Sequence, residues 1–333
     1  MDARIDPLLL ELIVVRGTHG GAERSALSRD AARGLMLRLR RGVYVERTAF
    51  EAMSAASRHL VRMRALTAVS PGPVAFSHVS AAVAHGLPVD HRRLDAVHVV
   101  VDAHRSRGLE GVVGHVAPTG AGVRRVGDLL VTDPVRTVVD LARLLPFEEG
   151  VTAADAGLRR GLDREALLEE LAETGDRRGS GRASDVVRFA HPGAESAAES
   201  RSRCTLLRLG VEPPVLQHRV VLADGSEAFL DGFLPGSGVG FEVDGAVKLL
   251  DPVIAPDARA ALVAEKRRED AVRLMLRGFL RWGWIEAVSP PRLAGLLARV
   301  GVGAATPRAV LADYVAAARD ARPRLVRARG LFT

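Results

Sequence analysis

The chain has 333 residues, of which 47% are hydrophobic, 26% charged and 4% aromatic. This composition excludes a disordered chain of low hydrophobicity, and the length predicts two or three domains. Lysine and arginine number 47 against 40 aspartates and glutamates, and the resulting formal net charge of +7 favours polyanionic partners. Cys204 is the only cysteine, which excludes intramolecular disulfides and suits a reducing compartment.

Near the start, the apolar stretch 8–15 is interrupted by Glu11 and preceded by Asp2 and Asp6, a pattern that is not typical of a signal peptide. No apolar run approaches the roughly 18 residues that a membrane-spanning helix needs. We therefore expect a cytoplasmic protein with no membrane partner.

The first 48 residues read as three short helices followed by a strand. Asp6-Pro7 predicts a helix start, and the apolar positions that follow predict a helix up to Gly17. Further helices are predicted over 22–27 and 29–39, and a brief strand over 42–45. Arginines crowd the last helix and its exit: Arg29, Arg33, Arg38, Arg40 and Arg41. This outline predicts a winged helix-turn-helix over 1–48, with a helical bundle that has a solvated basic face as the alternative.

The rest of the chain predicts an α+β, multi-domain protein. Over 49–175 we expect a middle α+β domain, with helices near 55–68, 80–85, 135–144, 150–160 and 163–172 and strands near 96–101, 111–116 and 128–131. A linker is expected over 176–193, because 176–184 is polar and glycine-rich. A third domain over 194–300 shows the order αβββαβα, with helices over 195–209, 258–276 and 291–299 and strands over 216–222, 228–234, 239–244 and 279–284. A basic tail, helical at first, fills 301–333.

Four acids stand out in this third domain. Asp231 lies in one predicted strand, and Glu242 and Asp244 lie on one face of the next strand, which a tight turn connects to the first. Glu199, on the preceding helix, can approach them. Converging carboxylates are what hard divalent cations such as Mg²⁺ require, whereas solvated acids on an edge strand are the alternative.

A set of short motifs in this domain resembles a known nuclease family. They are Glu199-Ser-Arg201, Pro213-Pro-Val-Leu-Gln217, Asp231-Gly-Phe-Leu-Pro235, Glu242-Val-Asp244-Gly-Ala-Val-Lys248, Glu265-Lys-Arg-Arg268 and Leu280-Arg-Trp282. Together they are similar to the very-short-patch-repair endonuclease relatives in the PD-(D/E)xK superfamily. The resemblance implies a restriction-endonuclease-like fold and Mg²⁺- or Mn²⁺-dependent hydrolysis of phosphodiester bonds.

The resemblance also implies the roles of individual residues. Asp231 takes the place of the central metal ligand, Glu242 that of the second and Glu199 that of the helical acid, with Asp244 beside them. Lys248 or Lys266 would orient water or screen developing charge. The usual lysine two residues after the second acid is replaced by Asp244, which leaves a degenerate, binding-only domain as the alternative.

The N-terminal half resembles AbiEi-type antitoxins of type IV toxin–antitoxin systems. The resemblance covers 1–175 and rests on Gly42-Val-Tyr-Val45, the run from Ser77 to Pro88 and the run from Thr132 to Ala142. It implies binding of duplex DNA by the winged helix through Arg29, Arg33, Arg38, Arg40 and Arg41, and a toxin partner or a homo-oligomer.

Other residues receive structural expectations. His78 and His85 could share a helix face, but we expect packing or capping residues rather than metal ligands. Trp282 and Trp284 alternate on a predicted strand, and we expect both in the core rather than as base-stacking platforms. The leading hypothesis is a DNA-binding protein with a metal-dependent endonuclease domain. The alternative is a non-enzymatic antitoxin or transcriptional regulator.

Overall fold

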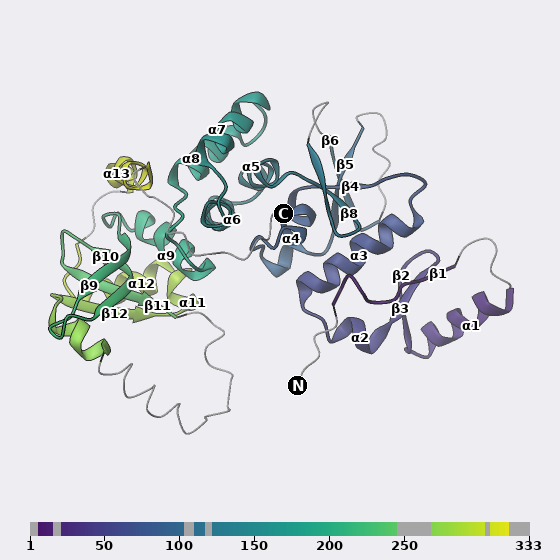
Figure 1. Cartoon of the computed structure of the whole chain (residues 1–333), viewed down its shortest axis with the longest axis horizontal. Coiled ribbons are helices and arrows are strands. Elements are labelled where there is room, and N and C mark those ends of the chain that lie inside the picture. The colour runs from purple at the N-terminus through teal and green to yellow at the C-terminus, as the bar shows by residue number, and fades with distance from the viewer. Residues whose placement is uncertain are drawn as a thin grey trace, which may run out of the picture. The chain divides into compact units, whose positions relative to one another are not determined.

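The computed structural model describes residues 6–15, 21–102, 110–116, 122–244, 268–303 and 307–319 (Figure 1). The described chain divides into two compact units, one built from 6–145 and 165–180 and the other from 146–164 and 181–319. Both units combine helices with sheets, which confirms a mixed α/β, multi-domain architecture. No described helix is long and apolar enough to cross a membrane.

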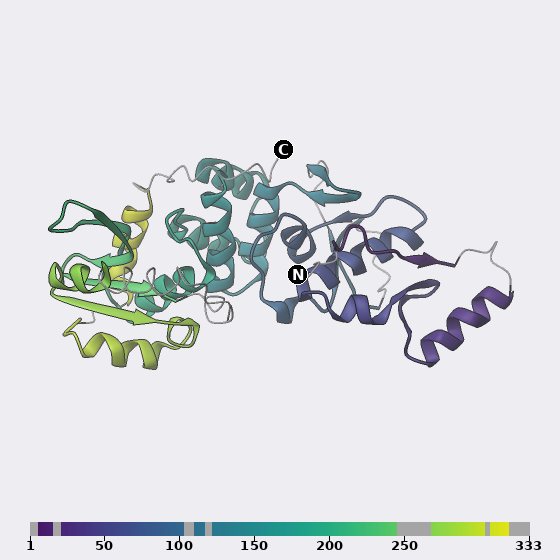
Figure 2. The ribbon, with the colours of Figure 1, turned by 60° about the horizontal axis from the view of Figure 1, so that its bottom comes forward.

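The first unit begins with a small three-stranded sheet. Its elements are β1 (Ile13–Val14), α1 (Gly21–Ala32), β2 (Met36–Arg40) and β3 (Val43–Glu46), and the strand order is β1-β3-β2. Strands β2 and β3 form a hairpin whose turn contains Gly42 at φ 80°, a backbone conformation that favours glycine. Helix α1 contacts β2 and has no buried residue, and Figure 2 shows it as the purple helix at the outer end of this unit.

Two of the helices predicted in this region are wrong. Residues 7–10 form a turn and a bend, and 13–14 join the sheet as a strand. The helix expected over 29–39 ends at Ala32 and is followed by β2, because Leu37 and Leu39 alternate with Arg38 and Arg40 at the period of a strand and pack into the core. In the described residues one helix precedes the hairpin, so the predicted helical pair of a winged helix-turn-helix is not seen there.

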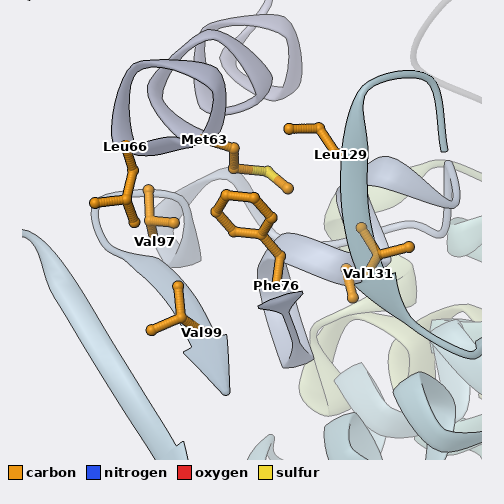
Figure 3. Packing of buried hydrophobic residues seen from close by; sticks show 8 residues of the cluster. Met63, Leu66, Phe76, Val97, Val99, Leu129 and Val131 are labelled. Carbon is orange, nitrogen blue, oxygen red and sulfur yellow. The ribbon is translucent and has the colours of Figure 1, made fainter. Parts of the chain in front are cut away.

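Helix α3 (Ala55–Val69) packs against both sheets of this unit. The second sheet has five strands in the order β6-β5-β4-β8-β7. Their bounds are Ala75–Phe76 (β4), Val97–Val101 (β5), Val112–Val116 (β6), Val123–Val126 (β7) and Leu129–Thr132 (β8). Phe76 is fully buried at the centre of the core, between Met63 of α3 and the valines of neighbouring strands (Figure 3).

Three of the remaining helices of this unit, α4 (His78–Ala84), α5 (Pro134–Leu144) and α7 (Arg164–Glu173), lie close to predicted positions. Helix α2 (Arg47–Glu51) and the 3₁₀ turn His91–Arg93 were not predicted. Helix α5 begins as its sequence predicts, because the Asp133 side chain accepts a hydrogen bond from the Val135 N–H and Pro134 occupies the first turn.

In the second unit, α6 (Phe147–Arg159), α8 (Ser180–Phe189) and α9 (Ala197–Arg208) precede the sheet. Helix α8 lies where the linker was expected, so the expectation of an irregular segment over 176–193 is wrong. Ala183, Val186 and Val187 are fully buried and have helical spacing, so they form the apolar face of this helix. The glycine-rich residues before them favoured the prediction of a linker.

The sheet of the second unit has the strand order β12-β11-β10-β9. Its strands are β9 (Val215–Val221), β10 (Glu227–Leu234), β11 (Val239–Val243) and β12 (Gly278–Trp282). Strands β9, β10 and β11 pair antiparallel, whereas β12 runs parallel to β11. Residues 268–274 are helical, and the remainder of the helix predicted over 258–276 lies outside the described residues. The predicted order of helices and strands is confirmed over the described part.

Helices α11 (Trp284–Ala287), α12 (Pro290–Ala298) and α13 (Pro307–Arg319) complete the second unit. The predicted strand 279–284 ends at Trp282, so the expectation that two tryptophans share a strand face is wrong. Trp282 is buried, stacks on Phe241 and donates a hydrogen bond to Ser202 Oγ of α9. Trp284 is 44% exposed and begins helix α11, whose N-cap residue is Gly283 in an extended conformation.

Candidate functional site: an acidic cluster at the end of a β-ladder

Asp231 lies where two strands of the second unit separate. The last ladder pair between β10 and β11 on this side is Gly232 with Phe241. At the next residue of β10, the Asp231 side chain takes the place of a backbone acceptor. Its Oδ2 atom accepts a hydrogen bond of 2.7 Å from the Val243 N–H. Strand β11 instead continues beside β12 as far as the pair Val243–Trp282. The Asp231 carboxylate is thereby held at the opening between β10 and β11.

Glu199 brings a second carboxylate to this position. It lies in the first turn of α9, where Ser196 Oγ accepts the Glu199 N–H at 3.1 Å and Glu199 Oε2 accepts the Glu195 N–H at 2.7 Å. The side chain is buried, and burial is the largest cause that raises the pKa of Glu199 to about 7. The negative charge of Asp231 is the next cause, so the two acids lie close enough to oppose each other's ionisation.

Glu242 belongs to a separate network of ion pairs. It pairs with Arg281 across the parallel β11–β12 ladder, and its Oε2 lies 3.5 Å from Arg281 Nη1. Its Oε1 lies 3.4 Å from Arg268 Nη2. These arginines were not assigned a role from the sequence, although Arg281 lies in the motif Leu280-Arg281-Trp282 and Arg268 ends the motif Glu265-Lys-Arg-Arg268. A register that places Glu242 beside position 281 requires the parallel crossover, which sequence periodicity does not reveal.

Asp244 holds the same arginine more tightly than Glu242 does. Arg281 Nε lies 2.9 Å from both Asp244 oxygens, and Nη2 lies 2.6 Å from Oδ1. These hydrogen bonds, together with the charges of Asp244, Glu242 and Glu269, raise the pKa of Arg281 above its ordinary value, against the opposing effect of burial. The residue that replaces the expected lysine therefore recruits a cation from the neighbouring strand.

Two relationships are seen among the four predicted metal ligands. Glu199 interacts with Asp231, whereas Glu242 and Asp244 share Arg281. Among the described residues, no three His, Cys, Asp or Glu side chains form a group that could hold a metal ion. The oxygen donors of Glu199 and Asp231 fit the chemistry of Mg²⁺, and Glu242 is the adjacent acid that Arg268 and Arg281 now neutralise. Lys248 and Lys266 lie outside the described residues.

The arginines proposed to contact DNA lie on or beside α1 and the β2–β3 hairpin. Arg29 and Arg33 are exposed, with Asp30 4.0 Å from Arg33, and Arg38 and Arg41 are exposed on the hairpin. Arg40 differs from them. Its Nη1 donates to the Glu110 carbonyl oxygen at 3.2 Å, and burial lowers the pKa of its guanidinium. Arg40 therefore ties the hairpin to another segment of the first unit.

A second polar cluster, which sequence analysis did not find, lies in the first unit. His98 Nδ1 and His115 Nε2 share a hydrogen bond of 2.8 Å, and the His115 ring stacks on His78 at a centroid distance of 3.5 Å. His78 Nδ1 lies 3.8 Å from Asp140, which pairs with Arg136 at 2.8 Å. Imidazoles that stack face to face and bond to each other do not point their nitrogens at a common metal. His78 therefore packs, as expected.

His85 also has a structural role in this unit. It is buried, and its Nε2 lies 2.8 Å from the Thr132 carbonyl oxygen. The backbone of His78, in contrast, has φ 49°, a left-handed conformation that is unusual for residues other than glycine.

Comparison with known proteins gives limited information. No protein-family profile matches the chain. Two proteins of Mycobacterium tuberculosis, one from strain CDC 1551 / Oshkosh and one from strain H37Rv, are each 32% identical to the chain over 162 residues. The match covers 48% of this chain and 59% of each relative, and both relatives are described as uncharacterized proteins. The chain is thus similar to bacterial proteins along about half of its length.

Proposed function

We propose that this protein binds duplex DNA and that its second unit hydrolyses phosphodiester bonds in a reaction that depends on Mg²⁺ or Mn²⁺. The observation that supports this most is the pair Glu199 and Asp231. Glu199 is buried and Asp231 is half-buried, and the charge of Asp231 opposes the ionisation of Glu199. Such a pair at the end of a β-ladder is suited to binding a divalent cation.

The protein's own residues would act as follows. Asp231 and Glu199 supply the oxygen ligands, and Glu242 completes the set when it leaves Arg268 and Arg281. A bound Mg²⁺ supplies charge stabilisation on the phosphate and a more acidic bound water. Because the pKa of Glu199 is about 7, cation binding near neutral pH releases a proton from this site. Arg281 keeps a positive charge beside the acids in the place of the expected lysine.

DNA binding is assigned to the first unit. Helix α1 has no buried residue, and Arg29, Arg33, Arg38 and Arg41 expose their guanidinium groups on or near it. Exposed arginines bind phosphates through charge and paired hydrogen bonds. The resemblance to AbiEi-type antitoxins implies DNA binding by a winged helix, whereas the described residues show one helix before the hairpin, so the exposed arginines carry the proposal.

The direct test is the nicking of supercoiled plasmid by the purified protein in Mg²⁺ or Mn²⁺, with EDTA as the blank. Asp231→Asn and Glu199→Gln are expected to abolish nicking and to preserve DNA binding. Glu227→Gln is the matched control, since Glu227 lies on the same strand as Asp231 but is exposed and paired with Arg219. Nicking that survives in Asp231→Asn would show that the activity lies elsewhere.

A second candidate function is a non-enzymatic antitoxin or regulator, which binds a toxin partner or forms a homo-oligomer. The ion pairs of Arg281 with Glu242 and Asp244 favour it, because they already neutralise two of the four acids without a metal. Wild-type protein that binds DNA, neither nicks plasmid nor binds Mn²⁺ in calorimetry, and binds a second protein chain would establish this candidate.

A further inference from the structure

Gln217 combines two unfavourable features in one side chain of the second unit. It lies within β9, yet its backbone has φ 51°, which places it in the left-handed region. Residues other than glycine, asparagine and aspartate rarely adopt this conformation, and strands do not require it. Within β9 this backbone departs from the extended conformation of a regular strand.

One atom of the Gln217 side chain also lacks a hydrogen bond. The Nε2 atom is buried, and no acceptor for it is found among the described residues. A buried amide that lacks a partner opposes folding, and most buried polar groups in proteins are satisfied. Backbone strain and unmet donors are found together at positions where a ligand supplies what folding does not.

The position of Gln217 points to the ligand. On β9 and β10, Leu216 pairs with Gly232 and His218 with Leu230, so Gln217 and Asp231 lie between the same two ladder pairs without forming a ladder pair themselves. Neighbouring strands lie about 4.8 Å apart, so the two residues are neighbours across the ladder. Asp231 is in turn close to Glu199.

We propose that Gln217 is a phosphate-binding residue of this site and that its carboxamide donates a hydrogen bond to a non-bridging oxygen of nucleic acid bound beside Asp231. The proposal rests on the proposed function, in that it takes a phosphodiester as the ligand. An amide suits this place because it donates a hydrogen bond without adding charge next to acids that bind a cation.

Gln217→Gly provides the test, because glycine accepts the left-handed backbone and removes the unmet donor. If the residue served folding alone, this variant would have a lower Tm and would keep its affinity for DNA. We expect instead a Tm at least equal to that of the wild type, together with a loss of about three- to ten-fold in affinity for a 20-base-pair duplex, the range expected for one hydrogen bond. Gln217→Asn, which keeps the amide and tolerates a positive φ, should lose less affinity than Gln217→Gly.

Affinity is measured by fluorescence anisotropy in EDTA. The full chain carries Arg29→Ala, Arg33→Ala and Arg38→Ala, so that contacts proposed for the first unit do not mask the second. Equal affinity of the Gly variant and its parent would overturn the proposal, as would a parent that does not bind the duplex. If Gln217→Gly unfolds, the comparison of Gln217→Asn with the isosteric Gln217→Glu decides, and equal affinities of these two would overturn it.

The two proposals fail in different ways. If the wild-type protein binds DNA without nicking it, the proposed hydrolase activity is wrong, whereas the proposed phosphate contact of Gln217 still stands. Metal-dependent nicking that Gln217→Gly preserves at the wild-type KM and kcat would support the hydrolase and remove Gln217 from its site.

Discussion

Glu199 and Asp231 are 32 positions apart in sequence, yet the charge of Asp231 helps to raise the pKa of Glu199. Helix α9 presents Glu199 in its first turn, and Asp231 lies at the end of a β-ladder. Each carboxylate makes the ionised form of the other less favourable, although Asp231 accepts the Val243 N–H and Glu199 accepts the Glu195 N–H.

This relationship predicts a pH-dependent penalty on stability. The folded pKa of about 7 exceeds the ordinary value of 4.5, so the unfolded chain releases the Glu199 proton first as pH rises. Stability therefore falls between pH 4.5 and 7 and stays low above that range. In EDTA, Glu199→Gln should raise the free energy of unfolding at pH 8 by up to about 3 kcal/mol and change it little at pH 4.5.

Urea denaturation at the two pH values measures this difference. Glu227→Gln is the control, because Glu227 is exposed on β10 and is not among the groups that shift the pKa of Glu199. A Glu199→Gln variant that is no more stable at pH 8 than the wild type would show that the carboxylate is not opposed by its surroundings.

The histidine cluster predicts loss of stability in acid. Burial lowers the pKa of His78 to about 2 and that of His98 to about 4, and it also lowers the pKa of His115. Since the unfolded histidines take up protons near pH 6.5, stability should fall as pH decreases from 6.5 to 4. Asp140 opposes part of this fall, because burial raises its pKa to about 6.

The measurement is the Tm of the wild type and of His115→Asn across pH 4 to 7.5. The variant removes one titrating imidazole and the hydrogen bond to His98, so its Tm should be lower at pH 7.5 and should decrease less steeply in acid. Parallel profiles of Tm against pH for the two proteins would show that His115 does not contribute to the loss of stability in acid.

Substitution of the hairpin arginines should affect DNA binding or stability, depending on the residue. If each of these exposed arginines neutralises one phosphate in the proposed complex, Arg38→Ala with Arg41→Ala should weaken duplex binding and reduce the slope of log affinity against log salt by about two. Arg40→Ala should instead lower Tm with less effect on the slope, because its guanidinium bonds to the Glu110 carbonyl.

Affinity titrations at 50 to 300 mM salt provide this test. Arg125→Ala, which removes an exposed arginine of β7 in the same unit, is the control and should leave the slope unchanged. The interface would be misplaced if Arg125→Ala and the hairpin variant changed the slope equally.

The sequence by itself determined most elements whose signal is local. The helices at 55–69 and 134–144 and the order of helices and strands after residue 194 follow from apolar periodicity and from caps such as Asp133-Pro134. The same reasoning failed where the apolar residues fit both the period of a helix and that of a strand. Leu35 and Leu39 have helical spacing, but Leu37 and Leu39 alternate with arginines, and packing against the core selected the strand. The segment of α8 begins with glycine-rich sequence, which favoured a linker, although the residues that follow have an apolar helical face.

The acids themselves could also be named from the sequence, but only the tertiary structure decided which of them meet. Asp231 was expected opposite Glu242, and the structure adds that Glu199 is its electrostatic partner and that Arg281 joins Glu242 to Asp244. The physical reason is that these contacts depend on the parallel pairing of β11 with β12 and on the packing of α9. Both are long-range choices made by the burial of side chains such as Phe241 and Trp282, and no local sequence pattern encodes them.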